Sequence, residues 1–254
     1  MSEILQAALI PFIGTAAGSA CVFFMGGGLN ETVRKVLSAF AAGIMTAASV
    51  WSLIIPAIDR SAGMGKLAFM PAAAGFITGI GIFIIIDRII VRIKQSKTTG
   101  AEEKTSMLVL AVVIHNIPEG MAAGAVYAAV LAGTEDITLS AALALVTGIS
   151  IQNFPEGAII SLPLRSKGEK KSRAFLCGIL SGVAESIGAV VTIAAAGLVV
   201  PVLPFLLSFA AGAMIYVVIK ELVPEFSEGK GHDLCMLVFA VGFAVMMALD
   251  TALG

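Results

Sequence analysis

Long apolar segments alternate with short polar connections along nearly the whole chain. Each apolar segment has about 20 residues or more, which is the length that a helix needs to cross a bilayer, and the charged residues collect between the segments. The pattern therefore predicts an all-α membrane protein with eight transmembrane helices. The predicted spans are residues 5–26, 35–57, 67–87, 107–131, 138–163, 174–196, 199–220 and 234–253.

The composition agrees with a membrane protein. Apolar residues make up 58% of the chain and charged residues 13%, whereas a soluble domain carries about 25% charged residues. We expect the lipid bilayer as a partner, and no nucleic acid. Cys21, Cys177 and Cys235 lie in separate apolar segments and are predicted to be packing residues. The first apolar segment lacks a preceding basic stretch, so we expect a retained span and not a signal peptide.

The basic residues predict how the chain is oriented. Alternate connections hold 14 of the 16 Lys and Arg residues, and the opposite side has only Arg60 and Lys66. Because basic connections stay in the cytoplasm, both termini are predicted to lie outside. The longest connection, 88–106, is predicted to be a mobile cytoplasmic loop of a single transport domain covering residues 1–254. The expected location is the cell membrane (plasma or inner), as a multi-pass protein.

One pair of similar segments suggests an inverted repeat. The second span reads "FAAGIM" at 40–45 and then "IIPAID" at 54–59, while the seventh reads "FAAGAM" at 209–214 and then "LVPEF" at 222–226. These spans are predicted to run in opposite directions, so helices 1–3 and 6–8 would be inverted repeats around helices 4 and 5. Secondary transporters are often built this way, with sites near the midplane. The alternative is chance convergence of Ala/Gly-rich helices, although the shared proline makes that less attractive.

A second pair of segments carries polar residues into the membrane. "HNIPEG" at 115–120 is nearly repeated by "QNFPEG" at 152–157. Glu119, Glu156 and Glu185 are the only acidic residues deep inside predicted spans, and each costs about 2.5–3.5 kcal/mol at bilayer depth. No predicted span contains a midplane Lys or Arg, so protons or a bound cation must compensate these charges.

Depth and spacing predict that the polar residues form one cluster. His115 and Glu119 are four residues apart, and Gln152 and Glu156 repeat that spacing, so each pair shares a helix face. At 1.5 Å per residue, these residues and Glu185 lie about 10–18 Å from the cytoplasmic ends of their spans. The expected metal ligands and their neighbours are His115, Asn116, Glu119, Gln152, Asn153, Glu156 and Glu185.

The prolines of both segments extend this prediction. Pro118 and Pro155 lack the N–H that a helix needs, so each helix should kink and leave a carbonyl free beside the polar residues. Disturbed backbone at this depth is tolerated where it lines a cavity. The alternative is an ordinary transmembrane kink.

The ligand chemistry favours a divalent ion. Imidazole, carboxylate and amide groups without a thiolate suit Zn²⁺, Fe²⁺, Mn²⁺ or Co²⁺. Together with one or two divalent ions, the three carboxylates would have a net charge near zero. The number of bound ions therefore stays open.

The two motifs resemble the signature of the ZIP metal transporters, and "AESIGA" at 184–189 and "FAAGAMIYVVIKELVPE" at 209–225 are similar to ZIP segments as well. The resemblance, to the short prokaryotic type, implies uptake of divalent metal into the cytoplasm. Zn²⁺ would be the substrate, with Fe²⁺, Mn²⁺, Cd²⁺ and Co²⁺ as further ions. It implies primary ligands at His115, Glu119, Gln152, Glu156 and Glu185, with Asn116 and Asn153 at an adjoining position.

The resemblance also suggests residues of a pathway. Met45 and Ser52 would line the outer path, and Asp59 and Asp250 would attract cations at its entrance. Glu221, Glu225 and His232 would receive the ion at the inner mouth, unless they are simply solvated interfacial residues.

Three residues and one connection depart from the family pattern. Gln152 and Asn153 are neutral where many members have His and an acidic residue, which argues against a tight second ion. Residues 88–106 contain no histidine, so metal sensing through this connection is not expected. Ser186 follows Glu185 where relatives often have proline.

Two other functions and one assembly remain as alternatives. An intramembrane metalloenzyme, with Glu185 as the general base of a hydrolase, lacks an HExxH helix, so we do not expect an enzyme. A carrier of organic substrates would want a midplane Arg or Lys. The small residues at 72–81 would permit a homodimer, or equally packing within one chain.

Overall fold

Polar side chains in or next to the predicted connections cap the N-termini of two helices. The structure is a computed structural model that describes residues 2–25, 30–97, 101–134, 137–227 and 231–253, and within these ranges the side chains of 93–97, 101–113 and 115 are excluded. Asn30 Oδ1 accepts the backbone N–H of Thr32 at 3.0 Å, and Thr138 Oγ1 accepts that of Ala141 at 3.0 Å. Each contact satisfies a backbone donor that a helix start leaves without a partner.

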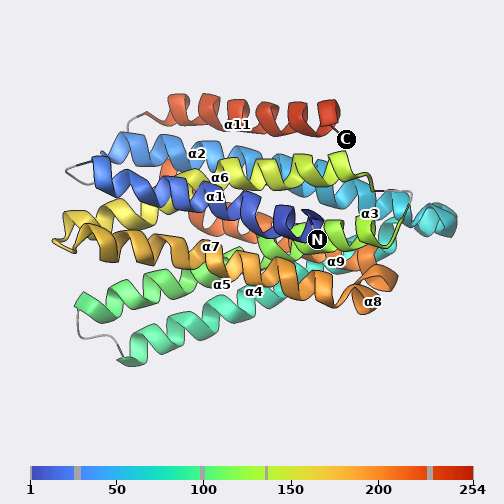
Figure 1. Ribbon diagram of the computed structural model, residues 1–254, viewed down its shortest axis with the longest axis horizontal. Helices are drawn as coiled ribbons and strands as arrows, with labels where there is room; N and C mark the ends of the chain where they lie inside the picture. Colours follow the sequence, from blue (N-terminus) through green and yellow to red (C-terminus); the bar gives the residue numbers. More distant parts are fainter. Residues whose placement is uncertain (1, 26–29, 98–100, 135–136, 228–230, 254) are drawn as a thin grey trace.

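The described chain is a bundle of long helices that lie side by side (Figure 1). Some of the long helices are continuous, and two others are interrupted by turns of a different helical type. The continuous helices are α1 (Ser2–Phe24), α4 (Phe69–Lys97), α5 (Ala101–Leu131), α6 (Leu139–Ser166), α7 (Lys171–Ala194) and α11 (His232–Leu253). One interrupted helix contains α2 (Glu31–Ala48), η1 (Ser49–Ile54) and α3 (Ile55–Arg60), followed by the 3₁₀ turn η2 (Ala62–Leu67). The other contains α8 (Ala196–Val199), η3 (Val200–Val202), α9 (Leu203–Val217), η4 (Val218–Leu222) and α10 (Val223–Ser227).

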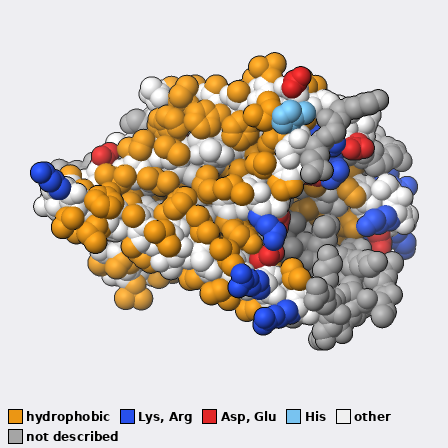
Figure 2. Space-filling view, turned by 180° about the vertical axis from the view of Figure 1, so that it is seen from behind, with side chains coloured by type: hydrophobic (Ala, Val, Ile, Leu, Met, Phe, Trp, Pro, Cys, Tyr) orange, Lys and Arg blue, Asp and Glu red, His pale blue; other side chains and the backbone are white. Residues whose placement is uncertain are grey.

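The helices match the predicted membrane spans in length and composition. Within the described residues, seven helical segments are long and apolar enough to cross a membrane. The remaining predicted span, 107–131, lies within α5, but part of it lies outside the residues whose side chains are described. Hydrophobic side chains cover much of the face in Figure 2, and Lys and Arg lie mainly in one half of it. The all-helical, multi-span class of the prediction is therefore confirmed.

The predicted loop at 88–106 is largely helical. Residues 88–97 continue α4 and residues 101–106 begin α5, while 98–100 are outside the described residues. The prediction placed the helix ends where the apolar runs end. A helix can continue past that point, because Arg, Lys and Gln are good helix formers whose side chains need no burial.

Glycines join the helices in specific pairs. A Cβ atom added at Gly14 or Gly18 of α1 would lie 1.9 Å from a carbonyl oxygen of α6, and one at Gly120 of α5 would lie 2.1 Å from the Glu185 carbonyl oxygen of α7. Comparable contacts join α2 to α11 and α4 to α9. All these contacts between a described glycine and the backbone of another helix fall within two sets. We call them the first set (α1, α5, α6 and α7) and the second set (α2, α4, α9 and α11).

The glycine contacts have the pairing that an inverted repeat requires. Gly43 packs on the carbonyl of Phe239, and Gly242 packs on that of Phe40. Gly212 packs on the carbonyl of Phe76, and Gly79 packs on that of Phe209. The two "FAAG" segments thus make equivalent contacts with α11 and α4. Of the small residues at 72–81, Ala72, Gly75 and Gly79 are buried within the chain, whereas Gly81 has no atom of the protein within 4 Å of an added Cβ.

The backbone of the two interrupted helices is disturbed at matching places. Each has a π-helical turn, η1 or η4, a few residues after its "FAAG" segment. The N–H of Ile55 bonds to the carbonyl of Val50 and that of Val223 to the carbonyl of Val218, five residues back. A proline follows each turn, at Pro56 and Pro224, and removes a further backbone donor. Such turns often occur at functional sites.

Candidate metal site

Helices α5, α6 and α7 bring four predicted polar residues into the protein interior. Glu119 is 2% exposed, Glu185 is 1% exposed, and Gln152 and Asn153 are fully buried. The close approach of Gly120 to the backbone of Glu185 holds α5 against α7 at this level. Buried carboxylates are rare unless something pairs with them, so this position calls for a partner.

Contacts among these residues place them in one cluster. Asn153 Nδ2 donates to Glu185 Oε2 at 2.6 Å and lies 3.4 Å from the carbonyl oxygen of Pro11 on α1. Glu119 interacts electrostatically with Glu156 and Glu185 and lies next to Gln152. The structure therefore brings together residues of the fourth, fifth and sixth predicted spans, as the sequence suggested.

Many polar atoms in this cluster lack a hydrogen-bond partner. Among the described residues, nine buried side-chain nitrogen or oxygen atoms have none. An unpaired buried group costs about 1–3 kcal/mol, so their concentration marks a place for a ligand or water. Seven of the nine belong to this region: Thr15 Oγ1, Asn116 Nδ2, Glu119 Oε2, Gln152 Nε2, Gln152 Oε1, Asn153 Oδ1 and Glu185 Oε1.

The cluster does not have the geometry of a finished coordination shell. The side chain of His115, one predicted ligand, lies outside the described residues. In the part of the chain with described side chains, no three His, Cys, Asp or Glu groups are close enough to hold one ion. The hydrogen bond from Asn153 engages one oxygen of Glu185. A bound ion would therefore have to draw the carboxylates closer together.

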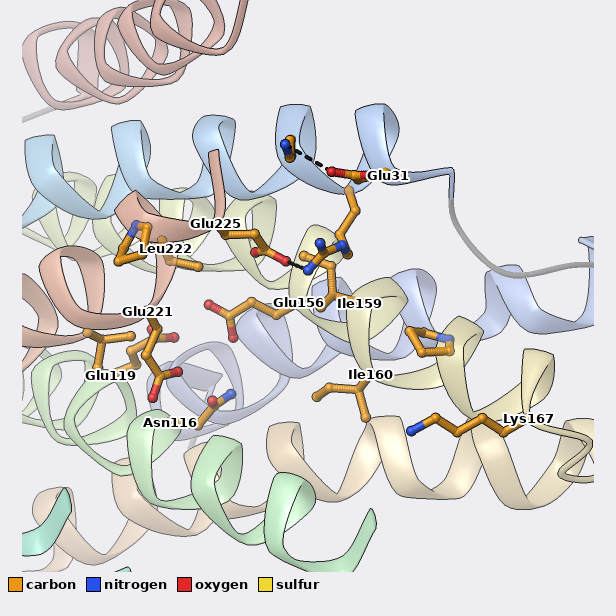
Figure 3. Close-up of a pocket in the computed structure, with 15 residues that line it drawn as sticks. Glu31, Asn116, Glu119, Glu156, Ile159, Ile160, Lys167, Glu221, Leu222 and Glu225 are labelled. Atoms are coloured by element: carbon orange, nitrogen blue, oxygen red, sulfur yellow. Dashed lines mark hydrogen bonds and ion pairs between the residues drawn. The ribbon is translucent and has the colours of Figure 1, made fainter. Parts of the chain in front are cut away.

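A cavity of about 730 Å³, the large cavity, leads from the cluster to one end of the bundle (Figure 3). Asn116, Glu119 and Glu156 line its deep part, and Glu221 points into it from η4. Its remaining charged lining residues are Glu31, Arg34, Lys35, Lys167 and Glu225. Because Arg34, Lys35 and Lys167 belong to the predicted cytoplasmic connections, the large cavity opens at the basic end of the protein.

The mouth of the large cavity contains ion pairs that the sequence did not reveal. Arg34 of α2 pairs with Glu225 Oε1 of α10, and Ser38 Oγ donates to Glu225 Oε2. Both oxygens of Glu225 are thus engaged, while Lys35 pairs with Glu31 at 3.0 Å. His232, the other predicted mouth residue, is exposed at the start of α11 and is not part of the described lining. Apart from the polarity of Arg34 and Ser38, nothing in the sequence indicated their contacts with Glu225.

The residues predicted for the outer path lie at the opposite end of the site. A cavity of about 240 Å³, the small cavity, is lined in part by Ser52 and Asp250. Ser52 Oγ lies 2.8 and 2.9 Å from the two carboxylate oxygens of Asp250. Asp59 is exposed at the end of α3, outside the described lining, and Met45 is buried among apolar side chains.

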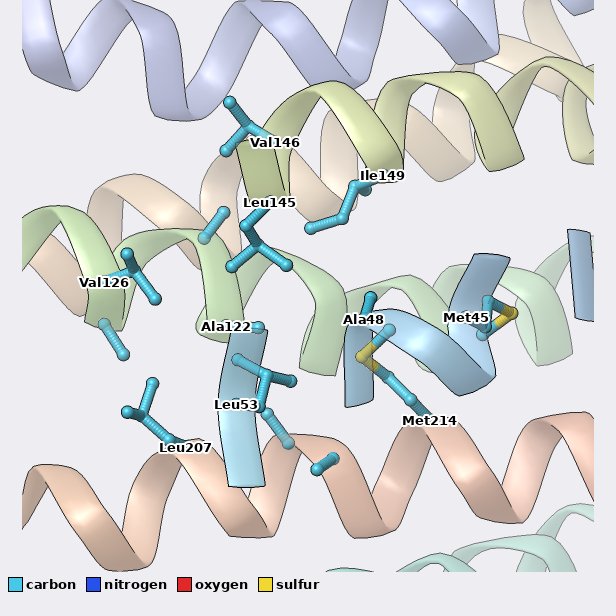
Figure 4. Close-up of a cluster of buried hydrophobic side chains, with 14 of the residues drawn as sticks. Met45, Ala48, Leu53, Ala122, Val126, Leu145, Val146, Ile149, Leu207 and Met214 are labelled. Atoms are coloured by element: carbon cyan, nitrogen blue, oxygen red, sulfur yellow. The ribbon is translucent and has the colours of Figure 1, made fainter. Parts of the chain in front are cut away.

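Buried apolar side chains form a cluster that includes Ala122, Leu145 and Ile149 (Figure 4), and the order of residues along α5 and α6 places these three between the small cavity and the site. On α5, Ala122 stands between Glu119 and Val126, which lines the small cavity. On α6, Leu145 and Ile149 stand between the small cavity and Gln152. The site therefore communicates with the large cavity and is closed toward the small one.

Comparisons with known proteins show which family the chain resembles. The family model described as "ZIP Zinc transporter" matches residues 102–250. The chain is 33% identical to the human protein called zinc transporter ZIP11, over all of this chain and 98% of that protein. It is 34% identical to zinc transporter ZIPB of Bordetella bronchiseptica, covering 96% of this chain and 79% of that one. It is 35% identical to zinc transporter GufA of Myxococcus xanthus, covering 80% and 81%.

Proposed function

Because the chain belongs to the ZIP zinc transporter family, we propose that Zn²⁺ crosses the membrane through the buried cluster on α5, α6 and α7 and leaves through the large cavity. The family consists of metal transporters, which favours a transporter over the intramembrane metalloenzyme considered above. The observation that carries the proposal is the group of buried polar atoms without partners, which opens to the large cavity. A divalent ion would satisfy these atoms and compensate the carboxylate charge.

In this proposal the ligands are His115, Glu119, Gln152, Glu156 and Glu185. Asn116 and Asn153 adjoin them, and Asn153 holds Glu185 while the site awaits an ion. The donor set has only one nitrogen that is a strong ligand, at His115. It would therefore also accept Fe²⁺, Mn²⁺, Co²⁺ and Cd²⁺.

The path through the protein follows the two cavities. Asp59 and Asp250 attract the ion, Ser52 orients Asp250, and Met45 belongs to the apolar barrier that must open. On the other side, Glu221 receives the ion on its way out. Glu225 is better assigned to the ion pair with Arg34, because both of its oxygens are engaged. His232, exposed at the basic end, would meet the ion only after release.

The membrane setting completes the proposal. Eight spans in one domain place both termini outside and the basic end, with the large cavity, in the cytoplasm of a cell membrane. Transport is then directed inward. The exposed apolar side chains of α4 and α11, such as Ile77, Ile85 and Leu237, would face lipid.

Purified protein in liposomes tests this function. We expect saturable Zn²⁺ entry, measured with a zinc-sensitive dye trapped inside, and competition by Mn²⁺, Fe²⁺, Co²⁺ and Cd²⁺ but not by Mg²⁺. His115→Ala is expected to abolish entry. Flux no greater than in protein-free liposomes, or full flux with His115→Ala, would contradict the proposed path.

The outer carboxylate provides a smaller, separate prediction. Asp250→Asn keeps the shape of the side chain and removes its charge, so we expect weaker capture of Zn²⁺ at the small cavity. The KM for uptake should rise several-fold, with little change in the maximal rate. Increasing salt should raise the KM of the parent protein more than that of the variant, because screening acts on the charge that the variant lacks. Equal KM values at low salt would exclude Asp250 from the path.

A further inference from the structure

We propose that Thr15 of α1 is a positioning residue of the metal site, whose hydroxyl holds the carboxylate of Glu185 through a bound water molecule. The inference rests on the proposed function, because it assigns Glu185 as a ligand. It adds α1, a helix that contains no predicted site residue.

Thr15 lies where three helices meet. A Cβ atom added at Gly182 of α7 would be 3.1 Å from both Cβ and Oγ1 of Thr15. One added at Gly157 of α6 would be 2.3 Å from the backbone oxygen of Thr15. Gly157 directly follows Glu156, and Gly182 precedes Glu185 by three residues on the same helix face. Thr15 thus packs against the two site helices next to two proposed ligands.

The Glu185 side chain is directed toward this junction. Side chains on a helix lean toward its N-terminus, so Glu185 leans along α7 toward Gly182 and Thr15. Asn153 supports this placement, because its amide lies 2.6 Å from Glu185 Oε2 and 3.4 Å from the carbonyl of Pro11, one turn before Thr15.

The hydroxyl of Thr15 lacks the hydrogen bond within its own helix that several other helical hydroxyls of the described chain make. Seven Ser and Thr residues donate to the carbonyl four residues earlier, including Thr46, Thr78 and Thr192. Thr15 Oγ1 is fully buried and has no partner, and the carbonyl of Pro11 at the corresponding position is shared with Asn153. The hydroxyl is therefore available for a contact outside its own helix.

Thr15 Oγ1, Asn153 Oδ1 and Glu185 Oε1, one oxygen atom from each of the three helices that pack here, are buried without a hydrogen-bond partner. The hydroxyl is a donor, and the other two atoms accept hydrogen bonds. One water molecule can accept from Thr15 and donate to both acceptors, which satisfies all three. Glu185 would then be held at both oxygens, with Asn153 on Oε2 and the water on Oε1.

The inverted repeat points to the same residue. Gly120 of the first motif packs on the backbone oxygen of Glu185, and Gly157 of the second packs on that of Thr15. Thr15 therefore occupies on α1 the place that Glu185 occupies on α7. One repeat supplies the ligand, and the other supplies a group that orients it.

Thr15→Val removes the hydroxyl and keeps the shape, and it tests the proposal in the liposome assay. We expect the KM for Zn²⁺ to rise about 10-fold, as for other groups that orient metal ligands, with the maximal rate per folded protein within about twofold. Thr15→Ser keeps the hydroxyl, so its KM should equal that of the parent protein. A purely structural role would reduce the amount of folded transporter and not its KM. The matched control is Thr192→Val, since that buried hydroxyl bonds within its own helix and its loss should leave KM unchanged.

Two further variants decide the remaining outcomes. If Thr15→Val reduces the folded fraction, Thr15→Ala removes the same hydroxyl without branching, and its KM is read instead. A parent-like KM for whichever folded variant is measured overturns the inference. Glu185→Gln is measured beside it. Loss of uptake there with a normal KM for Thr15→Val contradicts only the role of Thr15, whereas normal uptake in both overturns the site itself.

Discussion

Glu119→Gln abolishes zinc uptake and leaves the protein folded; this is the largest functional effect that we expect. The carboxylate is 2% exposed, has one oxygen without a partner, and interacts with two further acidic residues. A neutral amide of the same size removes a costly buried charge, so the fold does not suffer. It also removes the charge that compensates the ion, and uptake should fall at least 100-fold, by analogy with the loss of a charged partner.

Uptake and thermal stability together check this expectation. Zinc at about 100 times its Kd should stabilise the parent protein by about 2.7 kcal/mol and the variant hardly at all. Glu169→Gln is the control, because the same substitution there affects only a surface ion pair with Arg173. Uptake within twofold of the parent, with zinc still raising the melting temperature, would remove Glu119 from the site.

Gly120→Ala has the largest expected effect on stability. The added Cβ would lie 2.1 Å from the carbonyl oxygen of Glu185 and 3.1 Å from the nitrogen of Ala189. These are backbone atoms of α7, so they cannot rotate away and the two helices must separate. We expect a loss of about 3 kcal/mol or more, at the upper end of what overpacking causes, and a large fall in the yield of folded protein.

Gly81→Ala on α4 is the matched control, because nothing lies within 4 Å of the added atom. That variant should be as stable as the parent or gain about 0.5–1 kcal/mol from better helix propensity. Thermal melting of both variants in the same detergent gives the comparison. If Gly120→Ala melts at the parent temperature, α5 and α7 do not pack as closely as described.

Much of the fold follows from the sequence because local properties determine it. The lengths of the apolar runs predicted the helices, and the repeated "FAAG" segments suggested an inverted repeat, with which the equivalent contacts of Gly43 and Gly212 agree. The exact helix ends did not follow, since polar residues such as Arg88 and Arg92 continue α4 beyond the apolar run.

The candidate site was predictable only where one segment contains the information. Glu119, Gln152 and Glu156 stand out because polar residues are rare in apolar spans. The pairing of Arg34 with Glu225 joins residues 191 positions apart, so no local pattern indicates it. The apolar barrier has no signal either, because Leu145 and Ile149 look like any other core residues.

The glycine contacts have a consequence for how an ion gains access from either side. The first set carries every proposed ligand and is locked by helix backbones that touch at Gly14, Gly18, Gly120 and Gly157. No described glycine makes such a backbone contact between the first set and the second, and Gly148 of α6 meets only the side chain of Met246 on α11. Sliding is therefore easier along the boundary between the two sets than within either set. We expect the first set, with all the proposed ligands, to move as one rigid body relative to the second set. The bound ion would then keep the same ligands during the movement.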